Sequence, residues 1–471
     1  LDGEYWRSSL FTQMVAVVFD VTGGRELPTA RLISVFAGTL APVVLFWWIN
    51  RVIGIWPAIF AAGFCVLWPQ GIIESQMVRF YAAHVLTFLC GAVGLYLLLT
   101  EMRAARVTGL VMALLFWALA GHFQISSVIG IAGAVFGGGL ILAYQRFSSL
   151  RQWLYLGIGL ALCAVLGLAL LSATGLLERA WSFYRWTPAH AAPLRDYVGF
   201  YFDRLEAPYG LLWLASVVLA PLAFRVSVPL TLYCGSVFAV CFVTHSFGGM
   251  KSLRYLSYAM PFLFVLWALG LKALFDLLNA WGGRRAALSA SVIGVAALLA
   301  LTNFAPRSWT LAQGDGLPAR GDWHEARDVI GDWSDIEFVS TTRELHQIAH
   351  VGGYDVLFSA KRLTELNPQE DFEIDPRTGR PVAGSVDAMV QVARCTQEGL
   401  LVTSPFWWRT EGWEDKLTPL LDEAGVSLET REAGAVLAIR WTNTQPPPET
   451  CNALVARLSA GDAGLGTASG S

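Results

Sequence analysis

Ten apolar stretches of membrane-spanning length lie between residues 31 and 305, and they restrict the fold more than any other feature of the chain. A helix needs about 20 apolar residues to cross a bilayer core of roughly 30 Å. The sequence therefore predicts an α-helical polytopic membrane protein with about ten spans. The expected spans are 31–49, 54–69, 80–100, 107–121, 124–144, 153–175, 209–224, 227–246, 257–278 and 286–305.

The composition supports a membrane protein and argues against a nucleic-acid partner. Hydrophobic residues make up 55% of the chain and charged residues only 15%, against about 25% charged residues in ordinary soluble domains. The formal net charge of −3 gives no basic surface for nucleic acid. The 19 Trp and 27 Phe suit interfacial belts, where aromatic rings lie at the level of the lipid headgroups.

Arg and Lys are unevenly distributed between the two sets of loops, and this predicts the orientation in the membrane. Positive charge concentrates on the cytoplasmic side of membrane proteins. We therefore expect the denser set to be cytoplasmic, and the loops around Glu74 and Arg254 to be extracytoplasmic. The denser set contains Arg51, Arg103, Arg106, Arg146, Arg151, Arg225, Lys272, Arg284 and Arg285.

After Ala305 the pattern changes from spans to a soluble domain. A linker at 306–320 precedes short apolar runs typical of strands, at 336–341, 354–358 and 399–406, and amphipathic segments typical of helices. A small extracytoplasmic α/β domain is expected, with 367–384 as a long exposed loop and 452–471 as a disordered tail. The predicted domains are 1–30, 31–305, 306–451 and 452–471.

Two cysteines lie in the soluble region, Cys395 and Cys451, whereas the other five fall within predicted spans. In an oxidising compartment a lone pair of this kind is a candidate disulfide. Two unrelated buried thiols explain the pair equally well.

An acidic pair, Asp2 and Glu4, stands before the first span. A carboxylate at a membrane boundary can act as a general base or hold a divalent cation, although two acids near a terminus are also common on a solvated surface. The half-apolar stretch 8–20 follows and is expected to lie in the interface plane. Since extracytoplasmic carboxylates at the start of a polytopic chain usually follow a span, we expect one upstream of Leu1; the alternative is a short tail translocated by itself.

A second polar cluster joins two spans at 72–82. Glu74 and Arg79 are five residues apart where a helix leaves the bilayer. They either form a structural ion pair or point into a cavity with Tyr81 to bind a polar headgroup.

The third cluster, at 246–261, carries Lys251, Arg254 and Tyr255 before Pro261. Arginine presents a planar fork of donors that matches phosphate oxygens. At headgroup level this pair either binds a lipid phosphate or acts as a general anchor to anionic lipid.

The long loop 176–210 mixes aromatic and charged residues with His190, a composition shared by sugar-binding sites and interfacial loops. Of the two histidines near spans, His122 is the better ligand candidate, and His84 is expected to be a packed side chain.

In order and spacing, these clusters resemble the GT-C membrane glycosyltransferases, most of all the branch with the dolichyl-phosphate-mannose protein mannosyltransferases and the lipid A aminoarabinose transferase. The likeness covers most of residues 1–280. The family pattern has an acidic first loop, an "ARL-x-S" helix start, an "R-x-Y-A" turn and a "K-x-x-RY" turn before Pro. The matching residues are Asp2 and Glu4; Ala30, Arg31, Leu32 and Ser34; Arg79, Tyr81 and Ala82; Lys251, Arg254, Tyr255 and Pro261.

The chain departs from the family pattern at two places in the first loop. Gly3 separates the two acids, which are adjacent in the family, and the His-Pro-Pro element is absent, with Leu27-Pro28 near its place. Because of these two departures, the family pattern alone does not assign the type of acceptor or the residue that acts as the base.

The resemblance implies transfer of a sugar from a polyprenyl-phosphate donor to a lipid, glycan or protein acceptor, at the outer face of the bacterial inner membrane. Asp2 is the expected base, and Glu4 or Glu74 would orient it or hold a divalent metal ion. The donor phosphate is assigned to Arg254 and Lys251, with Arg79. Glu74, Tyr81, Tyr255 and His122 are expected to line the substrate cavity.

Three other functions compete with the transferase. Transporters and flippases place ionisable groups at mid-membrane and show repeated halves with broken helices, whereas these spans are nearly free of charge and show no repeat. An O-antigen ligase or polymerase would share the lipid-phosphate chemistry but not the acidic first loop. A scaffold without catalytic activity would tolerate Asp2→Asn.

Overall fold

The computed structural model describes most of the chain as two compact units, one ending at residue 316 and the other beginning at residue 317. The described residues are 9–24, 27–101, 103–173, 175–185, 194–313, 323, 325–359, 371–375, 378–410, 413–444, 446–448, 451 and 454.

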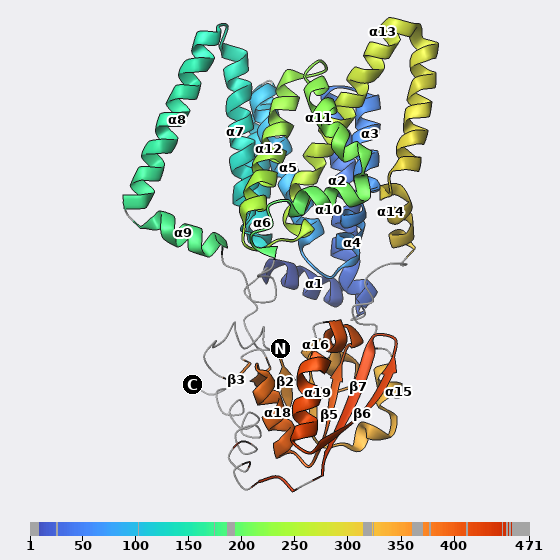
Figure 1. Ribbon diagram of the computed structural model, residues 1–471. Helices are drawn as coiled ribbons and strands as arrows, with labels where there is room; N and C mark the ends of the chain where they lie inside the picture. The colour runs from blue at the N-terminus through green and yellow to red at the C-terminus, as the bar shows by residue number, and fades with distance from the viewer. Residues whose placement is uncertain are drawn as a thin grey trace. The chain divides into compact units, whose positions relative to one another are not determined.

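The first unit is helical, and a helix forms at each of the ten expected spans (Figure 1). Its elements are α1 (Ser9–Thr22), α2 (Leu27–Val52), α3 (Ile55–Val66), α4 (Pro69–Gln76), α5 (Tyr81–Thr100), α6 (Arg103–Phe123), α7 (Ser127–Arg146), α8 (Leu150–Ala173), α9 (Leu176–Arg185), α10 (Phe200–Tyr209), α11 (Leu211–Ala223), α12 (Val228–Phe247), η2 (Leu253–Tyr255), η3 (Ser257–Ala259), α13 (Met260–Leu301) and α14 (Phe304–Ala312).

Six of the described helices are long and apolar enough to cross a membrane, or up to eight if each of two bent pairs counts as one span. The last two expected spans, 257–278 and 286–305, form the two arms of α13, which is kinked at Gly283 with φ 75°. The number of ten spans therefore stays a prediction, although mostly apolar helices through the first unit are a finding.

The two bent pairs interrupt spans at defined residues. α3 and α4 meet at 57°, and α10 and α11 meet at 103°. Pro69 begins α4, where a missing N–H costs no hydrogen bond. Gly210 joins α10 to α11 with φ 46°, a left-handed conformation that glycine adopts without strain. Both breaks bring short polar helices to one end of the bundle, where α14 also lies (Figure 1).

Close helix packing fixes the bundle around an aromatic core that includes the fully buried Trp48, Phe88 and Phe262. A Cβ added at Gly94 of α5 would lie 2.7 Å from the carbonyl oxygen of Gly109 in α6, so only glycine permits this approach. At the opposite end of the bundle from α4, Arg51 pairs with Glu101 at 3.1 Å, which places two of the loops expected to be cytoplasmic side by side.

The second unit is the expected α/β domain, built on a seven-stranded mixed sheet of order β3-β4-β2-β1-β5-β7-β6. β1 pairs in parallel with β2 and β5, β2 pairs in parallel with β4, and the β6-β7 hairpin adds an antiparallel edge. Its elements are α15 (Ala326–Ile330), η4 (Gly331–Asp335), β1 (Val339–Thr341), α16 (Glu344–His350), β2 (Val356–Phe358), β3 (Phe372–Ile374), β4 (Pro381–Ala383), α18 (Val386–Cys395), β5 (Glu398–Thr403), the π-helix η5 (Phe406–Thr410), α19 (Trp413–Glu423), β6 (Val426–Ala433) and β7 (Val436–Asn443).

Two apolar clusters cover the two faces of this sheet. Met389 and Leu417, from α18 and α19, pack on one face (Figure 1). Val329, from α15, packs on the other face with Trp323 and Trp333.

Two segments differ from the sequence prediction. The expected loop 367–384 contains β3 and β4, and β4 is buried although it begins with Pro381. Parallel pairing of Leu357 in β2 with Val382 brings β4 into the sheet. Strands of three residues are too short for their alternating pattern to be recognised in the sequence. In the expected linker, residues 306–312 belong to α14, whose Ser308 hydroxyl donates to the Leu67 carbonyl at 2.7 Å.

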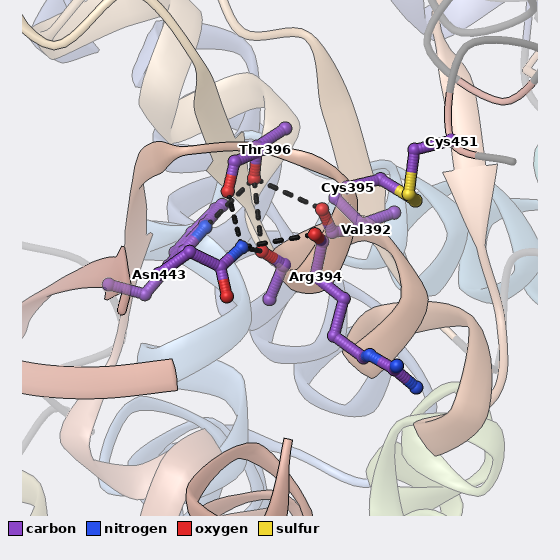
Figure 2. The surroundings of a disulfide bond; sticks show 8 residues. Val392, Arg394, Cys395, Thr396, Asn443 and Cys451 are labelled. Carbon is purple, nitrogen blue, oxygen red and sulfur yellow. Dashed lines mark hydrogen bonds between the residues drawn. A yellow bond between two sulfur atoms is a disulfide. The ribbon is translucent and has the colours of Figure 1, made fainter. Parts of the chain in front are cut away.

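The two cysteines of the soluble region form a disulfide, Cys395–Cys451, with a Cα–Cα distance of 5.1 Å (Figure 2). Next to it the amide of Asn443 donates to three carbonyl oxygens at the end of α18, those of Ala393, Arg394 and Thr396, at 2.8–3.0 Å. These bonds satisfy carbonyls that a helix end leaves without partners. The end of α18 is thus held by both a covalent and a polar connection.

We expect the double substitution Cys395→Ser/Cys451→Ser to lower the free energy of unfolding of the second unit by about 2–4 kcal/mol, because the bridge closes a long loop of the unfolded chain. Thermal unfolding of the full chain in detergent, with and without dithiothreitol, measures this. The reductant should destabilise the wild type and leave the double variant unchanged. A wild type insensitive to reduction would contradict the prediction.

Candidate functional site

The centre of the candidate site is the carboxylate of Glu74, which is 1% exposed. It lies on α4, one turn after Gln70, whose amide donates to Glu74 Oε1 at 2.9 Å. The hydroxyl of Ser257, from η3, donates to the same oxygen. Oε2 has no hydrogen-bond partner in the described structure. Since a buried polar atom without a partner is costly, Oε2 is the atom at which a ligand would be stabilised.

Arg254 supplies the positive charge of the site from η2. Its guanidinium lies 5.5 Å from the ring centre of Tyr81 and 5.3 Å from that of Tyr255. Aromatic faces attract cations, so the two rings hold the guanidinium in place. Its charge acts on Glu74, although the two side chains form no direct ion pair, and its Nε is buried without a hydrogen-bond partner. A cation and a carboxylate thus influence each other, and each keeps one buried atom without a hydrogen-bond partner.

Lys251 faces away from this centre. Its ammonium donates to the carbonyl oxygens of Ser246, at 2.6 Å, and Gly248, at 2.8 Å, at the end of α12. Burial, with the nearby charge of Arg185, holds the pKa of Lys251 below its usual value, while Asp196 acts in the opposite direction. Two of its three donors are therefore used to fix the turn that carries Arg254.

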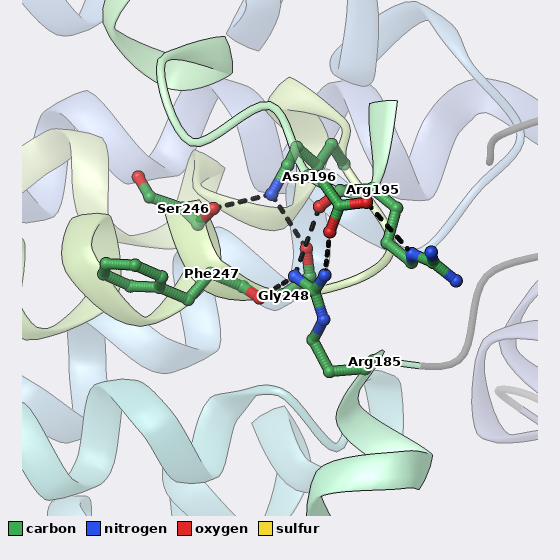
Figure 3. Close-up of polar contacts among 7 residues, drawn as sticks. Arg185, Arg195, Asp196, Ser246, Phe247 and Gly248 are labelled. Carbon is green, nitrogen blue, oxygen red and sulfur yellow. Dashed lines mark hydrogen bonds and ion pairs between the residues drawn. The ribbon is translucent and has the colours of Figure 1, made fainter. Parts of the chain in front are cut away.

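The segment after α9 is tied to the same turn (Figure 3). Arg185 pairs with Asp196 and donates to the Phe247 carbonyl at 3.0 Å. Tyr184 adds a hydrogen bond from its hydroxyl to the Thr244 carbonyl. The described residues of the expected loop 176–210 thus position the Lys251 turn, and aromatic contacts to a substrate stay a prediction.

Arg79 does not form the ion pair with Glu74 that was one reading of the sequence. Its side chain is exposed, and its carbonyl oxygen accepts a hydrogen bond from Ser34 Oγ at 3.0 Å. The bond joins the start of α2 to the turn before α5. Glu74 points instead into the bundle, because the partners on α4 and η3 lie there.

An apolar cavity of about 410 Å³ adjoins Glu74. It is bordered by α2, α3, α4 and α5, and its lining includes Val35, Pro42, Val66 and Val85 in addition to Glu74. Its wall is therefore chemically suited to a hydrocarbon chain, with one carboxylate at its polar side.

Histidines form a buried polar network behind the site. His84 Nε2 bonds to Ser127 Oγ at 2.7 Å, and His245 Nε2 bonds to the hydroxyl of Tyr258 at 3.0 Å. The expectation that His84 is a packed side chain agrees with this arrangement. His122, proposed as a ligand, is exposed in the last turn of α6 and makes no hydrogen bond in the described structure.

Asp2, Glu4 and His190 lie outside the described residues. Within the described part of the chain, no three His, Cys, Asp or Glu side chains gather in an arrangement that could hold a metal ion. The sequence analysis missed Gln70, Ser257, His245 and Tyr258. Gln70 had one signal, its position one helical turn before Glu74, whereas Ser257 is 183 residues away and had none.

Comparison with solved structures finds the same fold in a membrane enzyme. The crystal structure of ArnT from Cupriavidus metallidurans in the apo state matches with a TM-score of 0.55 and 16% identity, covering 91% of this chain and 86% of that one. The same ArnT bound to undecaprenyl phosphate matches with a TM-score of 0.52 and 15% identity, covering 91% and 87%. The chain has the fold of ArnT. The resemblance seen in the sequence is thus confirmed at the level of the fold, and the chain is an integral membrane protein.

No family model and no curated protein matches the chain. At 15–16% identity the ArnT structures establish the fold alone.

We expect Ser257→Ala to lower the unfolding temperature, because Glu74 then loses one of its two hydrogen-bond donors inside the bundle. In a Glu74→Leu background the same substitution should have a smaller effect, since the buried acceptor is gone. Thermal unfolding in detergent of the wild type, the two single variants and the double variant gives the coupling energy between Ser257 and Glu74. Additive effects would show that this hydrogen bond does not hold Glu74.

Proposed function

We propose that the protein is a glycosyltransferase that moves a sugar from a polyprenyl-phosphate donor to an acceptor at the outer face of the membrane. One observation carries the proposal: the charge of Arg254 acts on Glu74 without a direct ion pair, and Glu74 lines an apolar cavity. A lipid-phosphate sugar needs a cation for its phosphate, a polar group for its sugar and an apolar surface for its tail. The ArnT fold, one example of which holds undecaprenyl phosphate, supports the same donor class.

In the proposed reaction an acceptor hydroxyl or amine attacks the anomeric carbon of the donor sugar. The bond from that carbon to the phosphate oxygen breaks, and its electron pair leaves with the polyprenyl phosphate. The proton of the acceptor passes to a carboxylate. Asp2 is the candidate base, with Glu4 beside it, and Glu74 would bind a sugar hydroxyl through Oε2.

Negative charge grows on the phosphate as the donor bond breaks. A positive group that is already in place stabilises that charge without reorganisation. Arg254 is suited to this role because Tyr81 and Tyr255 hold its guanidinium. Lys251 is reassigned from phosphate binding to positioning of the turn, because its ammonium is bonded to carbonyls. Arg79 would approach the phosphate from the exposed side.

A divalent metal ion could bind at the site only if the carboxylates of the first loop, Asp2 and Glu4, supplied ligands to it. Carboxylate oxygens suit such ions, and Glu74 Oε2 is the one described carboxylate oxygen at the site that lacks a partner. Asp2 and Glu4 would have to supply the other ligands. The sugar transfer described above needs no step through the ion.

We expect Arg254→Gln to reduce sugar transfer by about 100-fold or more, as the loss of one preorganised donor does in other enzymes. Arg254→Lys should retain part of the activity, since it keeps the charge but not the fork. Purified protein is incubated with polyprenyl-phosphate-linked sugars and acceptor, and the released polyprenyl phosphate is measured.

The matched control is Arg225→Gln, an exposed arginine in the turn between α11 and α12, which should leave transfer unchanged. Full transfer by Arg254→Gln, with an intact unfolding transition, would remove Arg254 from the mechanism.

A lipid flippase is the second candidate, because the structure shows two broken helices, a feature of transporters that the sequence did not reveal. Both breaks lie at the Glu74 end of the bundle, which fits an interfacial enzyme better than a midplane transport site. Proteoliposomes loaded with a fluorescent polyprenyl-phosphate lipid separate the two. Translocation without acceptor and without release of the sugar would favour the flippase.

A further inference from the structure

A second, smaller cavity lies at the same end of the bundle, and we call it the arginine cavity. It has a volume of about 80 Å³ and is formed where the two helix breaks meet α14 and η2. Residues from both breaks line it, among them Trp68 and Pro69 at the start of α4, and Pro208 and Tyr209 at the end of α10.

Hydrogen bonds between distant segments hold the walls of this cavity. The backbone N–H of Asn303 donates to the Pro208 carbonyl at 3.1 Å, which joins the start of α14 to α10. Ser308 Oγ bonds to the Leu67 carbonyl at 2.7 Å, and Gln76 bonds to the Leu311 carbonyl at 3.0 Å, which join α14 to the α3–α4 region. The cavity is therefore part of the fixed frame of the first unit.

Two arginines line the cavity, Arg204 from α10 and Arg307 from α14. Both are exposed, and neither forms an ion pair with a described carboxylate. Asp203 and Glu206 share α10 with Arg204 and are also exposed without pairing to it. The guanidinium of Arg204 lies 5.4 Å from the Phe200 ring centre, which restrains its position. Two arginines line one small cavity, and a pair of guanidinium groups turned toward it would match the oxygens of a single phosphate or carboxylate.

The rest of the lining is apolar and includes Ile73, Leu205, Leu256 and Met260. The arginine cavity, at about 80 Å³, is about one fifth the size of the apolar cavity of about 410 Å³, which suits a small charged group better than a sugar with its lipid. Apolar walls around two cations favour an anion that carries hydrocarbon next to its charge.

The arginine cavity adjoins the candidate site through Gln70 and Leu253. Gln70 lines it and donates to Glu74 Oε1 at 2.9 Å, and Leu253 of its lining is the neighbour of Arg254. Trp68 lines both cavities. A Cβ at Gly71 would lie 2.4 Å from the Trp68 ring, so that indole is closely confined. Gln70 would therefore lie between an anion bound in the arginine cavity and the carboxylate of Glu74.

We propose that the arginine cavity binds the phosphate or carboxylate of the acceptor, and thereby selects acceptors that carry such a group. The proposal rests on the transferase function given above. Donor and acceptor would then approach Glu74 from opposite sides of Trp68, the donor tail through the apolar cavity and the acceptor anion through the arginine cavity.

The test measures binding by calorimetry with the full chain in a neutral detergent. All proteins carry Arg254→Gln, which weakens the binding of a phosphate at the proposed donor site. The probes are dihexanoyl phosphatidate, inorganic phosphate and the uncharged dihexanoylglycerol. We expect phosphatidate to bind and dihexanoylglycerol not to bind. Arg204→Gln and Arg307→Gln should each weaken phosphatidate binding by about tenfold, the usual cost of one charge-assisted hydrogen bond.

The control is Arg225→Gln in the same background, which should bind phosphatidate unchanged. Equal binding of inorganic phosphate and phosphatidate would support the site and assign it to a soluble anion, whereas preference for phosphatidate assigns it to an anionic lipid. Unchanged phosphatidate binding in the double variant Arg204→Gln/Arg307→Gln, with an unaltered unfolding temperature, would overturn the proposal. So would equal binding of dihexanoylglycerol.

The proposed transferase and the anion site fail separately. If Arg254→Gln abolishes sugar transfer, and phosphatidate binding is unchanged by the substitutions at Arg204 and Arg307, only the anion site is overturned. Full transfer in Arg254→Gln together with binding that depends on both arginines overturns the transferase mechanism and leaves the anion site standing.

Discussion

The hydrogen bonds that hold Glu74 inside the bundle organise the candidate site. A carboxylate with 1% exposure is stable there only with donors to its oxygens, and Gln70 and Ser257 both donate to Oε1. This leaves Oε2 as the acceptor for a ligand. The Ser257 bond connects α4 to η3, and thereby holds the preceding turn η2, which carries Arg254, near the carboxylate. One polar interaction thus sets the geometry of both charges.

The helix breaks explain how a polar site can exist at the edge of an apolar bundle. A continuous helix satisfies its own backbone, and its side chains would face lipid or other spans. At the breaks after α3 and α10 the chain turns by 57° and 103°, so short helices with polar residues lie at the end of the bundle. Gln70, Glu74 and Arg204 are all carried by these two short helices. The fold therefore places ionisable groups next to the membrane without burying them at its centre.

Apolar pattern and local spacing predicted much of this protein. The expected spans are helical, the soluble region is an α/β unit, and Glu74, Arg254, Tyr81 and Tyr255 do converge. What the sequence did not show depends on contacts between distant segments. Ser257 looks like an ordinary turn residue until it meets Glu74, 183 residues earlier. Nor did the sequence show that the ammonium of Lys251 donates to two carbonyl oxygens at the end of α12. In the second unit β4 was missed because Pro381 is typical of a turn.

The position of Trp68 as a wall shared by two cavities has an evolutionary consequence. A substitution that moves this indole changes both compartments, because Trp68 lines both and Gly71 leaves its ring little freedom to shift. Relatives that take a new lipid carrier would therefore have to readjust which acceptors they take as well, and the two preferences would change together.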